Sequence, residues 1–243
     1  MTPSIDPPSA DSAVVVESAG NVVSILSAVG TSAPAAEPSV PTGLAPAAAV
    51  RKRPKPGERR VQILQTLASM LEQPGADRIT TAALAARLEV SEAALYRHFA
   101  SKAQMFEGLI EFVEHSVFAL VNQIAERETD ATAQAQKMLT VLLQFGEKNP
   151  GMTRVMVGDA LVFENDRLLA RMNQFFERIE SQLRQSLRAA AEAAGSTSPT
   201  ADAQAQASVL TAFAVGRLQR YARSGFKRSP TEYLDVALRL MCS

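Results

Sequence analysis

Residues 80–102, TTAALAARLEVSEAALYRHFASK, decide how this chain is interpreted. Within this segment Leu84, Ala85 and Leu88 recur at the spacing of one helix face. Residues 89–91 then interrupt the pattern before a second apolar series begins. The segment therefore predicts two short helices separated by a tight turn.

Side chains that favour helix starts stand where each helix would begin. Thr80 or Thr81 can cap the first helix, because a hydroxyl accepts a hydrogen bond from a free N–H group of the first turn. Ser91 can cap the second. The outward face of that second helix would carry Glu92, Ala93, Tyr96 and Arg97. Two crossing helices of this kind are typical of a helix-turn-helix that places one helix in the DNA major groove, although a helical hairpin inside a bundle has the same spacing.

The end of the segment favours DNA binding. Tyr96, Arg97, His98 and Lys102 cluster within seven positions beside Phe99. Hydroxyl, imidazole, guanidinium and ammonium groups are donors that phosphate oxygens accept. With this ending the chain resembles the TetR family of DNA-binding regulators, whose helix-turn-helix commonly closes with a tyrosine, a histidine and an aromatic residue before a lysine opens the next helix.

The resemblance implies an all-α, TetR-like fold. A three-helix DNA-binding domain would span 57–101, and a dimerisation and regulatory domain of about six helices would span 102–243. The residues implied to contact phosphates are Thr80 or Thr81, Tyr96, His98 and Lys102. The residues implied to lie against the bases are Ser91, Glu92, Ala93 and Arg97. Glu92 would either accept from a cytosine amino group or only suit the helix dipole.

Charge is distributed unevenly along a chain whose formal net charge is zero. Residues 1–50 contain four acids and no Lys or Arg, whereas residues 51–60 have a net charge of +5. The basic residues of this second stretch are Arg51, Lys52, Arg53, Lys55, Arg59 and Arg60. They form either a basic arm that attracts phosphates and reaches a minor groove, or a solubilising linker.

Composition disfavours catalysis and membrane insertion. The single cysteine, Cys242, excludes an intramolecular disulfide and suits a reducing cytoplasm, and His98 and His115 are too far apart for a short metal motif. Residues 1–56 hold nine of the thirteen prolines and predict a disordered Pro/Ala/Ser-rich tail. The apolar patch at 13–30 is interrupted by polar residues and lacks a basic start, so we expect neither a signal peptide nor a membrane span. No cofactor is expected.

Helical periodicity continues to the C-terminus. The predicted helices cover about 58–72, 102–127, 130–148, a short segment after 151, 165–194, 201–224 and 231–241. The two long late helices are the candidates for a dimer interface, since one helix-turn-helix reads only a few base pairs. The residues assigned to that interface are Phe175, Phe176, Ile179, Leu183, Leu210 and Phe213.

A closer resemblance is to the nucleoid occlusion members of the TetR family. It is carried by RITTAALAARLEVSEAALYRHFASKAQMFEGLIEFVE, FGEKNPGMTRVMVGDALVFENDRL, RMNQFFERIESQLRQSLR and RSGFKRSP, which lie within 59–235. It implies a homodimer, or a higher oligomer on DNA, that is nucleoid-associated in the cytoplasm. Bound to palindromic chromosomal sites, such proteins bind the tubulin homologue FtsZ and block the division ring. The implied partner-binding residues are Phe112, Val141, Gln144, Lys148 and Asn149.

Two alternatives remain open at this stage. The chain departs from the pattern of the nucleoid occlusion members at Leu120, Gln144 and Lys148, where others favour Arg, Gly and Arg, and Phe112 and Val141 also fit an ordinary core. A TetR-type repressor that leaves its operator when a small molecule binds would share the same fold. An enzyme or a purely structural helical protein is disfavoured by the basic end of the helix-turn-helix.

Overall fold

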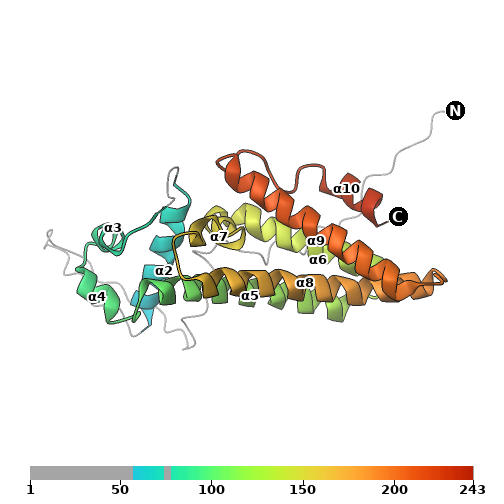
Figure 1. The fold of residues 1–243 in the computed structure, drawn as a ribbon, viewed down its shortest axis with the longest axis horizontal. Coiled ribbons are helices and arrows are strands. Elements are labelled where there is room, and N and C mark those ends of the chain that lie inside the picture. Colours follow the sequence, from blue (N-terminus) through green and yellow to red (C-terminus); the bar gives the residue numbers. More distant parts are fainter. Residues whose placement is uncertain (1–56, 74–77, 243) are drawn as a thin grey trace, which may run out of the picture.

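A computed structural model describes residues 57–73 and 78–242. Its elements, labelled as in Figure 1, are α2 (Glu58–Leu71), α3 (Thr81–Arg87), α4 (Glu92–Tyr96), α5 (Lys102–Arg127), α6 (Ala131–Lys148), α7 (Pro150–Met156), the 3₁₀ turn η2 (Asp159–Leu161), α8 (Asp166–Ala193), α9 (Pro199–Arg223) and α10 (Leu234–Met241). No strand occurs in these described residues, which confirms the all-α prediction. Within them, no helix is long and apolar enough to cross a membrane.

The N-terminal unit, α2 to α4, forms one end of the elongated molecule (Figure 1). Its core contains Leu67, Leu84, Leu95 and Phe99, each almost fully buried. Thr80 caps α3, since its Oγ1 accepts from the N–H of Ala83 at 3.1 Å. These local signals explain why the predicted helix-turn-helix forms at this place in the chain.

The turn between α3 and α4 has an unusual residue at its centre. Glu89 has a φ of 54°, in the left-handed region that favours glycine. The N–H of Val90 donates to the carbonyl of Ala85 at 3.0 Å, and the N–H of Glu89 donates to that of Ala86 at 3.1 Å. This pair of bonds is the Schellman ending of a helix, whose left-handed position is usually glycine. The turn is therefore formed at a conformational cost.

The body, α5 to α10, is a layered bundle with α5 as its long connection to the N-terminal unit (Figure 1). The antiparallel helices α8 and α9 pack along one another, and α6 contacts both of them as well as α5. Two ion pairs join α5 to α8: Glu107 with Arg167 at 2.6 Å, and Glu114 with Arg171 in two contacts of 3.0 and 2.5 Å.

The N-terminal unit contacts the body through α2. A Cβ added at Gly108 of α5 would lie 3.1 Å from two methyl carbons of Leu64. A Cβ added at Gly151 of α7 would lie 2.2 Å from the carbonyl oxygen of Ala68. Glycine at 151 is thus required for the close approach of α7 to α2, and this contact joins the two parts of the molecule.

Helix boundaries follow the sequence prediction closely, with one exception. The last helix begins at Leu234 rather than near Thr231, because Ser229 and Thr231 are engaged in a turn. In that turn the Oγ1 of Thr231 donates to Oε2 of Glu147 at 2.6 Å, and Ser229 donates to the same carboxylate. The predicted tail at 1–56 lies outside the described residues.

Candidate nucleic-acid interface

Helix α4 presents one face to solvent and buries the other. Leu95 and Phe99 anchor it, while Ala93, Tyr96 and Arg97 are exposed. Tyr96 retains 46% of its accessible surface. His98 and Ser91 are exposed at the two ends of the helix. Ser91, Ala93, Tyr96, Arg97 and His98, all from the predicted DNA-contact set, are therefore exposed on or beside α4.

Glu92 is held by a side-chain hydrogen bond at the start of α4. The Oγ1 of Thr81 donates to its Oε2 at 2.6 Å, which links the first residues of α3 and α4. Glu92 also lies in the first turn of α4, where the helix dipole favours a carboxylate. These two interactions favour a role in positioning α4, while the second carboxylate oxygen is left for a base amino group.

Lys102 is also held in place, by a partner that no sequence pattern indicated. It is the first residue of α5, and its Nζ forms an ion pair with Oε1 of Glu164 in the connection between η2 and α8. Ser101 caps α5 by accepting from the N–H of Gln104 at 3.2 Å, and Oε1 of Gln104 accepts from the N–H of Ala100 at 2.8 Å. This reciprocal capping fixes the position from which Lys102 projects.

The predicted basic arm is only partly described. Arg51, Lys52, Arg53 and Lys55 lie outside the described residues. Arg59 and Arg60 belong to α2, where Nη1 of Arg59 donates to Gln62 at 2.8 Å. Arg60 has a structural contact that an arm would not make: its Nη1 donates to the carbonyl of His98 at 2.9 Å, and its guanidinium lies 4.1 Å from the Phe99 ring centre. Arg60 thus supports the end of α4.

The predicted partner-binding residues are mostly covered. Phe112 and Val141 are buried, and the rings of Phe112 and Phe145 lie 6.1 Å apart. Asn149 is also buried, and its Nδ2 donates to the carbonyl of Phe145 at 2.8 Å. Only Gln144 and Lys148 of this set are partly exposed. Phe112, Val141 and Asn149 therefore support this region from beneath and do not form its outer surface.

The predicted dimerisation residues divide in the same way. Phe175, Ile179, Leu183 and Leu210 are in the core of the chain itself, because α6 and the α8–α9 contact cover them. The other two residues of the set, Phe176 and Phe213, are partly exposed. The outer surface of α8 and α9 instead exposes Leu169 and Val209.

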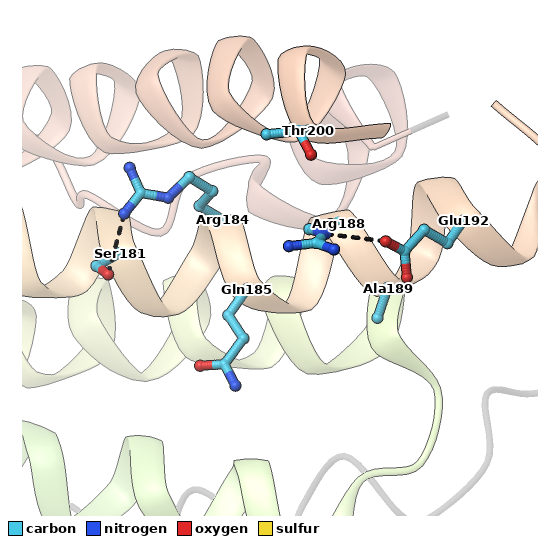
Figure 2. Close-up of a pocket in the computed structure, with 7 residues that line it drawn as sticks. All are labelled: Ser181, Arg184, Gln185, Arg188, Ala189, Glu192 and Thr200. Atoms are coloured by element: carbon cyan, nitrogen blue, oxygen red, sulfur yellow. Dashed lines mark hydrogen bonds and ion pairs between the residues drawn. The ribbon is translucent and has the colours of Figure 1, made fainter. Parts of the chain in front are cut away.

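A groove follows the outer surface of α8 toward its C-terminal end (Figure 2). Arg184 bonds to Ser181 at 3.3 Å and Arg188 to Glu192 at 2.9 Å, while Thr200 of α9 lies across from them. The groove is thus lined mainly by polar side chains, with Ala189 among them. The outer side of α8 and α9 therefore combines this groove with the exposed residues Leu169 and Val209 and the partly exposed Phe176 and Phe213.

Two features near the N-terminal unit were missed by sequence reasoning. Glu164 pairs with Lys102 across 62 positions, and no local pattern reveals such a contact. Beside it, Val162 and Phe163 retain 69% and 66% of their accessible surface. The sequence shows that these two residues are apolar, but apolar residues are also typical of a buried core, so it does not indicate their exposure.

Family models match both parts of the chain. Residues 63–109 match the model described as "Bacterial regulatory proteins, tetR family". Residues 129–243 match "Tetracyclin repressor-like, C-terminal domain", the SlmA-like form. The first match covers most of the N-terminal unit and the start of α5, and the second covers the body from just before α6.

Curated relatives are similar along nearly their whole length. The nucleoid occlusion factor SlmA of Photobacterium profundum is 53% identical over 188 residues, which are 77% of this chain and 95% of the relative. SlmA of Escherichia fergusonii is 52% identical over 186 residues, covering 76% and 93%. Among solved structures, the regulator FadR from Bacillus subtilis in complex with stearoyl-CoA has a TM-score of 0.60, covering 75% of this chain and 97% of that one. At 13% identity, that likeness concerns the fold alone.

Proposed function

The chain belongs to the SlmA nucleoid occlusion factors of the TetR family, a family of DNA-binding regulators and not of enzymes, and on that premise we propose that it prevents division-ring assembly over the nucleoid. In this proposal the chain binds palindromic chromosomal DNA as a homodimer in the cytoplasm. While bound to DNA, it binds FtsZ. One observation carries the proposal: the sequence identity of about 53% to an SlmA protein extends through the body and is not confined to the N-terminal unit.

DNA binding is supported by the exposed face of α4. A short helix whose apolar side is anchored by Leu95 and Phe99 can enter a major groove without disturbing the fold. Arg97 is the residue on that face with a fork of donors suited to guanine, and Tyr96 and His98 flank it as phosphate donors. We assign Ser91 and Ala93 to the same contact surface. Thr80 and Thr81 lie at the start of α3, beside the expected phosphate backbone.

A dimer is supported by the outer surface of α8 and α9. Leu169 and Val209 are exposed on these two adjacent long helices, and Phe176 and Phe213 are partly exposed beside them on the same helices. A two-fold contact there would bury these residues. It would also present two copies of α4 to successive half-sites of a palindrome.

The FtsZ contact is assigned to the end of α6. Lys148 and Gln144 are the partly exposed residues of the predicted set. A cation and an amide beside buried aromatics suit an acidic, partly apolar peptide. This end of α6 is followed directly by α7, which touches α2 at Gly151. DNA held by the N-terminal unit can therefore bias the partner surface through the α2–α7 contact.

The proposal is tested with the full-length protein, DNA and purified FtsZ. Chromosomal fragments retained by the protein are sequenced to obtain its sites. FtsZ polymers are then sedimented with the protein alone, with the protein plus a site duplex, and with the protein plus a scrambled duplex. We expect polymer to decrease only with the site duplex. A decrease that ignores DNA, or no decrease at all, contradicts the proposal.

Two variants separate the two contacts. Arg97→Ala should lose site recognition and inhibition together, because one guanidinium–base contact contributes about 1–3 kcal/mol. Lys148→Glu should keep DNA affinity and lose FtsZ binding, because it reverses the charge that faces the acidic peptide. If Lys148→Glu still binds FtsZ normally, the partner surface lies elsewhere.

Light scattering of the unbound protein tests the proposed dimer. A monomer at micromolar concentration would contradict the dimer proposal.

A further inference from the structure

An ion pair connects the N-terminal end of α5 with the connection between η2 and α8. Lys102 and Glu164 retain 24% and 10% of their side-chain accessible surface. A carboxylate this far from water needs a compensating charge, and the Lys102 ammonium supplies it. Removing that ammonium would leave Glu164 both charged and poorly hydrated.

The polarity of this pair distinguishes it from its neighbours. In the two ion pairs between α5 and α8, α5 contributes the acid and α8 the arginine: Glu107 with Arg167 and Glu114 with Arg171. At Lys102 the order is reversed, so α5 contributes a cation at its own N-terminal end. A cation is disfavoured there by the helix dipole, whereas an anion is favoured. The pair is therefore poorly explained as one more link between the two helices.

The same cation is the one that the proposed function directs at a DNA phosphate. We propose that Glu164 and a DNA phosphate compete for Lys102, so that Glu164 limits DNA affinity and DNA binding releases the η2–α8 connection from α5. The inference rests on the proposed phosphate contact of Lys102. A phosphate bound to Lys102 would repel the nearby Glu164 carboxylate. The positive end of the α5 helix dipole would attract the phosphate, whereas it disfavours an unpaired lysine.

The connection is held at both ends and joined to α5 by Glu164 in between. The N–H of Glu164 donates to the carbonyl of Leu161 at 3.0 Å, and Asn165 caps α8 by accepting from Arg167 at 3.0 Å. Val162 and Phe163 lie within this short span and are largely exposed. Release of Glu164 would therefore change the exposure of an apolar dipeptide when DNA binds.

A double-mutant cycle tests the competition. The full-length protein and its variants Lys102→Ala, Glu164→Gln and the double variant bind a fluorescent duplex taken from a chromosomal fragment that the wild type retains. We expect Glu164→Gln to bind about fivefold more tightly, which is the effect of removing a partly exposed ion-pair competitor. In the Lys102→Ala background the same substitution should have a much smaller effect, because only the repulsion between Glu164 and the phosphate remains. Glu107→Gln is the matched control, since it removes a carboxylate paired with α8 from the same helix α5, and its affinity should stay unchanged.

Hydrogen exchange provides a second measurement that a stabilising role alone would not change. Amides of residues 162–165 should exchange faster in the wild type when the duplex is added, and equally fast in Glu164→Gln with or without it. Thermal midpoints confirm that each variant is folded.

The outcomes distinguish this inference from the proposed function. If Lys102→Ala binds DNA like the wild type, the phosphate contact and this inference both fail. If Lys102→Ala weakens binding but Glu164→Gln also weakens it, Glu164 orients Lys102 toward the phosphate and competition is overturned. If Glu164→Gln tightens binding equally with and without Lys102, the effect is general electrostatics, and the inference is again overturned.

Discussion

The N-terminal unit and the body expose their helices to different degrees. Three short helices share one small core in the N-terminal unit, so α4 keeps a complete face in solvent. In the body, α6 contacts α5, α7, α8 and α9, and buried residues occur nearly all round it. The exposed face of α4 can therefore be changed without affecting the fold, whereas a binding surface on α6 shares its residues with the core.

The largest expected effect tests this difference at Phe112. Replacing this buried ring by alanine removes its contacts with Phe145 and leaves a cavity. Phe112→Ala should lower the free energy of unfolding by about 3–5 kcal/mol, measured by chemical denaturation. Tyr96→Phe is the counterpart in the N-terminal unit and should weaken DNA binding with an unchanged unfolding midpoint. A stable Phe112→Ala variant that loses only partner binding would contradict the assignment of Phe112 to the core.

The contact between the two parts gives the next effect. A methyl group at Gly151 meets the backbone oxygen of Ala68, which cannot move without displacing α2. Gly151→Ala should cost about 3 kcal/mol of stability, at the upper end for overpacking. Gly108→Ala is the matched control, because its methyl meets only the mobile side-chain end of Leu64. Equal midpoints for the two variants would show that the α2–α7 contact is dispensable.

The N-terminal unit was predictable because its signals are local. Helix caps, the apolar spacing and the interrupting turn all lie within residues 80–102, and they place α3, α4 and the start of α5. In the body, the same apolar spacing places the helices but not their exposed faces. Val141 and Ile179 have the period of an interface stripe, yet neighbouring helices cover both. The Lys102–Glu164 pair depends on chain segments 62 positions apart, which no period describes.

A gain in stability is expected in the N-terminal unit at Glu89. Its left-handed backbone costs a non-glycine residue about 1–2 kcal/mol, and glycine adopts it freely. Glu89→Gly should therefore raise the free energy of unfolding by about 1 kcal/mol, which corresponds to about 2–4 °C in the thermal midpoint. DNA affinity should not change, since Glu89 lies in the turn and not on the outward face of α4. A lower midpoint would mean that the Glu89 side chain contributes more than its backbone costs.

The smallest effect concerns Glu72 at the end of α2, where the two parts meet. Burial raises the pKa of this carboxyl, and the N–H of Gly151 that it accepts from opposes the shift only partly. A raised folded-state pKa means that the charged form destabilises the fold at neutral pH, and that this penalty is lost as pH falls through the raised pKa and is absent below the ordinary value of 4.5. Glu72→Gln keeps an oxygen for the Gly151 N–H and removes the charge. It should stabilise the protein at pH 7 by less than Glu89→Gly does, and the gain should disappear near pH 4 in denaturation experiments. A gain that is the same at both pH values would assign the effect to packing at the α2–α7 contact and not to the buried charge.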